Sequence, residues 1–157
     1  MRKLIAGSLA ACVWLAATAA VAGDRESYYY PKVSSQEVFD RQMLDVPPSG
    51  QEARVRFILN AAKAQHAAWG PPRFVIFEKG AESQHMIIIA LDDQVFETLY
   101  RARAVLAQLT SMLRGSEFFN KTGLITEATW FDLAKLLGFK DVVISDGRTW
   151  SHRVVLK

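Results

Sequence analysis

Residues 141–157 read DVVISDGRTWSHRVVLK, and this stretch decides the expected fold. Two runs rich in β-branched residues flank Asp146-Gly147, a dipeptide that favours a two-residue hairpin turn because both turn positions need a positive φ. Residues 73–78 and 83–91 form a similar pair of runs around Lys79-Gly80. The sequence therefore predicts two β-hairpins.

Apolar periodicity and end signals predict four helices outside the hairpins. Ser34 with Glu37, and Ser49 with Glu52, match the capping box, in which two side chains satisfy the first free N–H groups of a helix. Proline and glycine residues mark the helix ends. The expected helices cover residues 34–44, 49–69, 92–115 and 126–137, with Thr126 as the last N-cap.

The resulting order, ααββααββ, predicts an α+β fold. Residues 75–80, followed by His85, match residues 142–147, followed by His152, at an offset of 67, which indicates an internal duplication. We expect two helix–hairpin units that form a four-stranded antiparallel sheet with the helices packed on it. The apolar stripe of the 92–115 helix is expected to line this core.

The N-terminal region is typical of a secretory signal peptide. A basic start precedes an uncharged stretch from Leu4 to Ala22, whose end carries the small residues of a cleavage site. We expect a signal peptide over residues 1–22, an extended arm over 23–33 and a single α+β domain over 34–157. The expected location is the periplasm or the medium of a Gram-negative bacterium. Two alternatives stay open, an uncleaved anchor and lipidation at Cys12.

Charge and cysteine content argue against several classes of function. Without the two basic residues of the signal, the formal net charge falls from +3 to +1, so nucleic acid is not an expected partner. Cys12 is the only cysteine, so the mature domain is expected to be cysteine-free, without a disulfide or a thiolate nucleophile. No membrane contact is expected after cleavage.

A histidine–carboxylate pair is the leading candidate for catalysis. A two-residue turn at 146–147 places Asp141 opposite His152 on the inward face of the hairpin. A base with an orienting acid is two-thirds of a hydrolytic triad, although such a pair also serves simply to close a sheet. Ser151 points to the opposite face and Ser83 has no acid nearby, so neither is assigned as the nucleophile.

The remaining histidines do not indicate a metal site. His66 lies on the apolar stripe of the 49–69 helix and is expected to be a core residue, and His85 is expected to face Phe74. The three histidines are far apart in sequence, and no HExxH motif is present. No GxGxxG, P-loop or GxSxG motif occurs either, so no metal and no cofactor are expected.

Two further groups are candidates for binding. Arg101 and Arg103 lie close together on the 92–115 helix and either meet an anion or are simply solvated. Tyr28, Tyr29 and Tyr30 form either a recognition surface or a clamp that ties the N-terminal arm to the domain.

Four segments resemble a family of small exported proteobacterial proteins of unknown function. They are Tyr28–Pro31, Leu99–Ala104, Thr129–Phe139 and Ile144–Gly147 with His152, and the resemblance extends over nearly the whole mature chain. Members often carry the label molybdopterin-guanine dinucleotide biosynthesis protein A. That activity implies a glycine-rich loop after a strand and magnesium-binding aspartates, which have no counterpart here. The resemblance therefore implies export but no catalytic residue.

Three functions follow as hypotheses. The first is an exported, non-catalytic binding or accessory protein, whose partner is a periplasmic protein or a small molecule. The second is a hydrolase-like enzyme that uses His152 with Asp141. The third, disfavoured by the missing motifs, is the molybdenum-cofactor nucleotidyltransferase of the family label.

Overall fold

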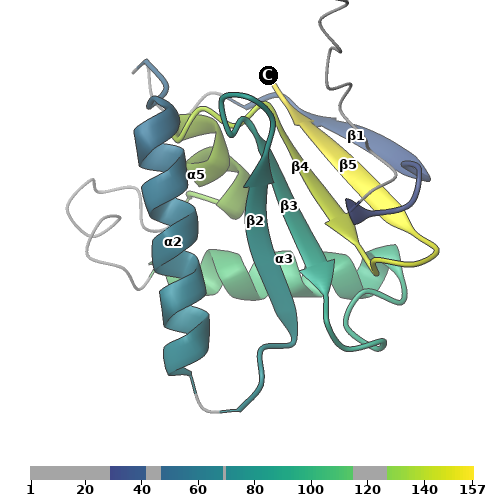
Figure 1. Ribbon diagram of the computed structural model, residues 1–157. Coiled ribbons are helices and arrows are strands. Elements are labelled where there is room, and N and C mark those ends of the chain that lie inside the picture. The colour runs from purple at the N-terminus through teal and green to yellow at the C-terminus, as the bar shows by residue number, and fades with distance from the viewer. Residues whose placement is uncertain (1–28, 42–46, 69, 115–126) are drawn as a thin grey trace, which may run out of the picture.

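The computed structural model of the 157-residue chain describes residues 29–41, 47–68, 70–114 and 127–157 (Figure 1). The elements, labelled as in Figure 1, are β1 (Ser35–Phe39), α2 (Gln51–Ala67), β2 (Phe74–Lys79), β3 (His85–Ala90), α3 (Leu99–Arg114), α5 (Trp130–Leu136), β4 (Asp141–Ser145) and β5 (Ser151–Leu156).

The five strands form one mixed sheet in the order β1-β5-β4-β3-β2. Both predicted hairpins are present, because β2 pairs with β3 and β4 pairs with β5 in antiparallel fashion. However, β1 runs parallel to β5, and β3 runs parallel to β4. The predicted four-stranded antiparallel sheet is therefore wrong. The chain between β3 and β4 contains α3 and α5 and is long enough for the crossover that parallel neighbours require.

Strand β1 replaces much of the helix predicted over residues 34–44. Ser34 does not cap a helix: its N–H donates to Ser151 O at 2.9 Å, and its Oγ accepts from the Ser151 N–H at 3.4 Å. A helix cap is worth about 1 kcal/mol, whereas pairing with β5 gives the segment a full ladder of backbone hydrogen bonds. Residues 42–46 of the predicted helix lie outside the described residues.

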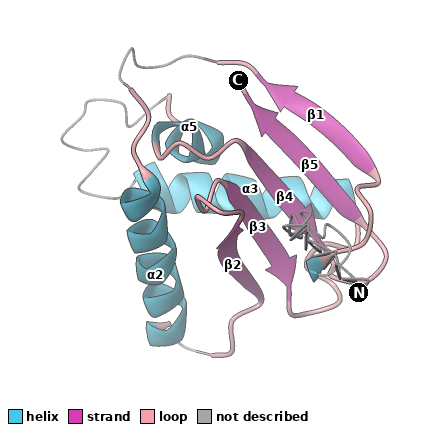
Figure 2. Ribbon diagram, turned by 45° about the horizontal axis from the view of Figure 1, so that its top comes forward, coloured by secondary structure: helices cyan, strands magenta, loops and turns pink. Residues whose placement is uncertain are grey.

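The domain has two layers, with the three helices on one face of the sheet. Figures 1 and 2 both show α3 crossing the strands on this side. Side chains from α2, α3 and α5 pack there against every strand of the two hairpins. The fully or nearly buried members include Ile58, Ile76, Met86, Ile88, Ala102, Leu106, Trp130, Ala134, Val142 and Ile144.

The opposite face of the sheet is partly covered by the N-terminal segment. Tyr30 is buried there against Ile87 and Val143. Ser151 Oγ donates a hydrogen bond to the Pro31 carbonyl at 2.9 Å, which holds the segment on β5. We call this side of the sheet the arm face, and the other side the helix face.

The connection between β4 and β5 is longer than predicted. It spans residues 146–150 instead of the two residues Asp146-Gly147. The Asp146 carboxylate closes this loop by accepting hydrogen bonds from three backbone N–H groups, those of Arg148, Thr149 and Trp150. Gly147 adopts the positive φ that the dipeptide predicts (+76°), so the turn chemistry was right but the loop length was not.

The two hairpins do not repeat as packed units. At the offset of 67, their strands align and their loops both contain a glycine of positive φ, Gly80 and Gly147. Equivalent residues nevertheless lie on opposite faces, because Ile76 belongs to the helix face and Val143 to the arm face. A duplicated helix–hairpin unit would keep each helix on the same side of its own hairpin. The predicted duplication is therefore not supported by the packing.

Helix α2 lies within the predicted range 49–69, but its N-cap and its buried residues differ from the prediction. Its N-cap is Gly50, with no side-chain cap, so the capping box expected one residue earlier is absent. Its buried residues are Arg54 and Ile58. His66 is exposed, so its assignment to the core was wrong.

Helices α3 and α5 keep the predicted faces but begin later than expected. Helix α3 begins at Leu99, after a series of turns and bends from residue 91. Its stripe is buried as predicted, through Ala102, Leu106 and Leu109. Helix α5 is capped by Thr129, which forms a capping box with Asp132. The predicted cap, Thr126, lies outside the described residues.

Candidate functional site

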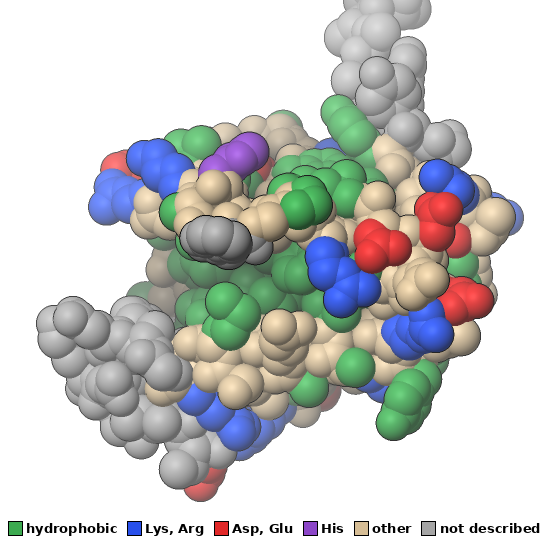
Figure 3. Space-filling view, turned by 90° about the horizontal axis from the view of Figure 1, so that it is seen from below, with side chains coloured by type: hydrophobic (Ala, Val, Ile, Leu, Met, Phe, Trp, Pro, Cys, Tyr) green, Lys and Arg blue, Asp and Glu red, His purple; other side chains and the backbone are tan. Residues whose placement is uncertain are grey.

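An apolar groove separates α2 from α3 on the helix face. Helix α2 lies against β2 while α3 lies against α5, and the space between α2 and α3 forms two adjoining cavities of about 290 and 350 Å³. Seen from below, the groove is a hollow in which hydrophobic side chains gather (Figure 3). We call it the α2–α3 groove.

Short side chains on one wall and long ones on the other give the groove its width. Alanines at spacings of three and four residues face it from α2, and leucine and methionine face it from α3. The floor is formed by β2. The residues concerned are Ala61 and Ala64 on α2 and Ala68 directly after it, Leu109, Met112 and Leu113 on α3, and Phe74 and Ile76 on β2.

The two ends of the groove differ in polarity. At one end, the rings of Phe57 and Trp130 lie 5.6 Å apart and close the first cavity. The second cavity opens beside Arg73 and Gln108. Arg73 is paired with Asp92 at 3.3 Å, and its side chain is 66% exposed. The first cavity is therefore almost wholly apolar, whereas the second is more polar and opens beside the Arg73–Asp92 ion pair.

The sequence analysis missed this groove because the predicted stripe of α2 is rotated by about one residue. That stripe comprised Val55, Ile58, Leu59, Ala62, His66 and Trp69. Ile58 is buried as predicted, but Leu59 is exposed, and Arg54, which the stripe did not include, is buried. The regular alanine spacing was the available signal, since alanines three and four apart share one helix face.

His152 points inward, as predicted, but its partner is not Asp141. Because β5 pairs through Ile144↔His152, Asp141 lies opposite Val155. His152 is buried, its ring stacks on Trp150 with centroids 6.2 Å apart, and Ser35 Oγ lies 2.8 Å from its Nδ1. The predicted pair is therefore wrong because the longer hairpin loop shifts the register.

Glu37 and Arg103 extend this contact to the other nitrogen of the ring. Glu37 Oε1 lies 3.4 Å from His152 Nε2, and Glu37 Oε2 is bound by Arg103 at 3.2 Å. Ser35 and Glu37 share one face of β1, two residues apart, so both reach His152 on the neighbouring strand. We call Ser35, His152, Glu37 and Arg103 the β1-edge cluster.

Asp141 forms a separate pair with His85 on the arm face. Its Oδ2 lies 2.9 Å from His85 Nδ1, and the two residues are register partners on the parallel strands β3 and β4. His85 was expected to face Phe74, but it pairs with Lys79 across the hairpin instead. His152 and Asp141, the two catalytic candidates of the sequence analysis, are therefore not neighbours.

Arg101 and Arg103 do not form a joint anion site. Arg101 pairs with Glu97 at 2.7 Å and donates to the Gln94 carbonyl at 2.8 Å, whereas Arg103 binds Glu37. Each arginine already holds a carboxylate of this chain. Because both side chains are about half exposed or more, these ion pairs contribute little to stability.

Tyr29 and Tyr30 act as a clamp, one of the two predicted roles. Tyr30 is buried on the arm face, and the Tyr29 ring lies 5.5 Å from that of Phe77. The ammonium of Lys79 lies within 6 Å of both tyrosine rings, a favourable cation–π distance. Tyr28 lies outside the described residues.

A buried arginine that the sequence analysis did not single out fixes one end of α2. Arg54 donates from three nitrogens to the carbonyls of Ser49, Glu82, Leu137 and Gly138. These carbonyls come from the loop before α2, the β2–β3 loop and the end of α5. Gly138 has φ +82°, and a Cβ there would lie 2.5 Å from Ser49 O, so this close approach requires glycine.

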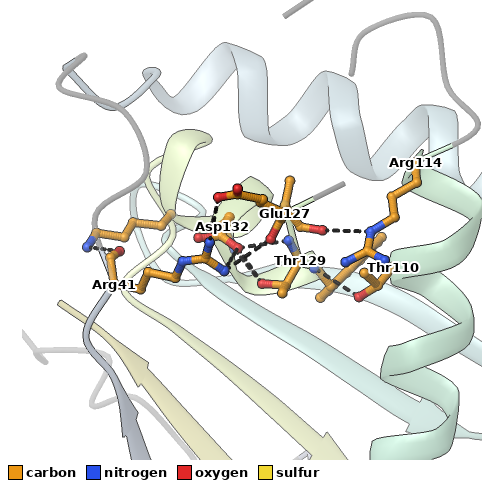
Figure 4. A network of polar contacts seen from close by, with 9 residues as sticks. Arg41, Thr110, Arg114, Glu127, Thr129 and Asp132 are labelled. Carbon is orange, nitrogen blue, oxygen red and sulfur yellow. Dashed lines mark hydrogen bonds and ion pairs between the residues drawn. The ribbon is translucent and has the colours of Figure 1, made fainter. Parts of the chain in front are cut away.

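A second polar network joins β1, α3 and α5 (Figure 4). Arg41 donates to the Glu127 carbonyl at 3.0 Å and lies 3.9 Å from Asp132 Oδ2, which also accepts from Thr129. These contacts satisfy the first turn of α5 from within the chain. They stabilise the start of the helix.

Among the described residues, no group of three His, Cys, Asp or Glu side chains could hold a metal ion. Within the same residues, no helix has the length and hydropathy needed to cross a membrane. The predicted signal peptide and Cys12 lie outside them.

Comparison with protein-family models, with curated proteins and with solved structures found no match to this chain.

Proposed function

We propose that this protein is an exported binding protein whose α2–α3 groove takes an elongated apolar small molecule. The observation that carries the proposal is the groove itself, two adjoining cavities of about 290 and 350 Å³ with mostly apolar walls. Ligand sites in proteins are typically concave, of this size, and apolar with a few polar groups.

The position of the polar groups supports an orientation for the ligand. Gln65 donates to the Phe74 carbonyl at 2.9 Å, so its amide is already engaged along the groove wall. Arg73 lies at the mouth and is largely exposed. An apolar chain therefore fits along the groove, with a polar end directed toward the more polar mouth beside Gln108 and the Arg73–Asp92 ion pair.

Export and the small-molecule class of partner belong to the same proposal. Export is supported by the basic start and the uncharged stretch up to Ala22. The near-neutral charge of the remainder favours an apolar ligand over a polyanion.

The test is binding of N-phenyl-1-naphthylamine, a neutral apolar dye whose fluorescence rises in an apolar site. We expect saturable binding by the protein. In Ala64→Phe, a ring fills the groove from the wall of α2. We expect the Kd for the dye to rise by about tenfold or more, which corresponds to about 1.4 kcal/mol of binding free energy.

Ala67→Phe is the matched control, because Ala67 lies on the same exposed part of α2 but does not line either cavity. It should bind the dye like the unchanged protein. Equal binding by both variants, or no saturable binding at all, would contradict the proposal.

A further inference from the structure

We propose that the β1-edge cluster is a hydrolytic site in which Ser35 is the nucleophile, His152 the general base and Glu37 the orienting acid. This inference is independent of the groove, because β1 and β2 are the opposite edges of the sheet. The substrate class is a small ester that reaches Ser35 from solvent.

The distances set up a consistent path for a proton. Ser35 Oγ lies 2.8 Å from His152 Nδ1, so the hydroxyl can donate to a ring whose proton is on Nε2. Nε2 is buried and has no hydrogen-bond partner within the described chain, and the carboxylate that lies near it is that of Glu37, at 3.4 Å. Because a buried N–H without an acceptor costs about 1–3 kcal/mol, closer approach of Glu37 is favourable.

The surroundings hold the base and the acid in place. His152 is 3% exposed and stacks on Trp150 with an interplanar angle of 6°, which restricts rotation of the ring. Arg103 binds the second oxygen of Glu37 at 3.2 Å, which restricts the position of this carboxylate. Nucleophile, base and orienting acid thus stand in the order that acyl transfer requires.

Ser35 is accessible, whereas its base is not. It is exposed on β1, the last strand at its edge of the sheet within the described residues. Backbone N–H groups on the outer side of an edge strand are not used by a neighbouring strand. Within this proposal, the outward N–H groups of β1 are the expected donors to an oxyanion formed at Ser35.

An exposed aromatic residue shares a face of α3 with Arg103 of the cluster. Tyr100 is 83% exposed and is placed three residues before Arg103 on α3, so the two side chains share a helix face. Its ring offers a surface for an apolar or aromatic alcohol group, and an aryl ester is accordingly the substrate that we expect to react.

The reaction balances without any further reagent. Ser35 Oγ bonds to the ester carbonyl carbon as its proton moves to His152 Nδ1. The bond to the alcohol oxygen breaks, and that proton leaves with the alcohol. Water then attacks the acyl-serine, gives a proton to Nδ1, and releases the carboxylic acid as the proton returns to Ser35 Oγ.

The experiment is labelling of the folded protein with diisopropyl fluorophosphate, followed by peptide mass spectrometry. An activated serine bonds to phosphorus and releases fluoride. We expect one adduct, on Ser35, and slow hydrolysis of p-nitrophenyl acetate that Ser35→Ala abolishes. In Glu37→Gln, the labelling rate should fall by about 100-fold, with an unchanged circular dichroism spectrum.

Ser34→Ala is the matched control, because it removes the adjacent exposed hydroxyl and leaves the cluster complete. It should be labelled at the wild-type rate. The absence of an adduct on Ser35 in the folded protein would overturn the proposal, as would equal labelling of Ser34 and Ser35. A Glu37→Gln rate equal to that of wild type would overturn the role of Glu37.

Discussion

Ile87 and Ile88 are neighbours on β3 with no exposed surface, yet they lie on opposite faces of the sheet and in different surroundings. Ile88 is enclosed by strands and helices, whereas Ile87 is covered by the N-terminal segment. His152 and His85 differ in the same way: one is buried on the helix face beside Ser35, and the other is partly exposed on the arm face beside Asp141. The comparison shows that the position of a residue in a hairpin does not determine the surroundings of its side chain. The layer that covers its face of the sheet does.

The two isoleucines give the largest contrast. Ile88→Ala should destabilise the domain by about 4 kcal/mol and Ile87→Ala by about 2 kcal/mol, because walls made of helices relax less into a cavity than a terminal segment does. Urea unfolding monitored by circular dichroism measures both values. Equal losses would show that the arm face is packed as rigidly as the helix face.

Arg54 sharpens the comparison on the helix face. Arg54→Met keeps much of the apolar stem but leaves the four carbonyls without their buried donor, which should cost about 3 kcal/mol. Arg56→Met on the same helix is the control, because Arg56 is exposed and pairs only with exposed Glu52. Urea unfolding gives the free energy of unfolding of each variant. If the values for Arg54→Met and Arg56→Met agree within about 0.5 kcal/mol, the range for surface substitutions, the buried hydrogen bonds of Arg54 do not stabilise the fold.

The two histidines should respond in the same order as the two isoleucines. His152→Gln disturbs a buried ring between Ser35 and Glu37 and should cost about 2 kcal/mol. His85→Gln disturbs a half-covered pair with Asp141 and should cost less than about 1 kcal/mol. Thermal unfolding of the two variants at one pH decides the order, and a larger loss at His85 would reverse it.

Asp146 gives a small effect on stability, and this effect depends on pH. Burial raises the pKa of Asp146, but hydrogen bonds from the Thr149 side chain and from backbone N–H groups of the loop outweigh it, so the pKa is lowered overall. A lowered pKa means that ionised Asp146 stabilises the fold above its ordinary pKa, and that this contribution is lost as the pH falls through the folded-state value.

Asp146→Asn should therefore be less stable than wild type by about 1 kcal/mol at pH 7. The difference should shrink as the pH falls below about 4. Urea unfolding at pH 7 and at pH 3 checks both statements. A difference that grows on acidification would show that Asp146 is not held as a carboxylate.

Local patterns predicted the two hairpins, the helix over 49–69 and the stripe of α3, because residues close together in the sequence determine each of these features. The β1 segment failed because the capping-box match of Ser34 with Glu37 is a local pattern of four residues, whereas the pairing of this segment with β5 depends on residues 117 positions away. The parallel pairing of β3 with β4 had no signal within either hairpin, since an α-helical crossover decides it.

The candidate sites were predictable only in part, for the same reason. Strand alternation gave the inward direction of His152, but its partners depend on the register, which the five-residue loop shifted. Ser35 and Glu37 could not be predicted as partners of His152, because their segment was predicted to be a helix. The groove depends on which face of α2 is buried. The sequence did not indicate this face because it includes Arg54, and charged residues are rarely buried.

The place of β1 has a consequence for how the chain acquires its structure. Ser35 and its partner His152 are separated by 117 residues, so the first strand to be synthesised waits for one of the last before it can join the sheet. Such distant pairing slows folding, because the entropy cost of closing a long loop comes before the favourable free energy of the contacts. The nascent polypeptide is therefore expected to stay unpaired at this edge until β5 has been synthesised.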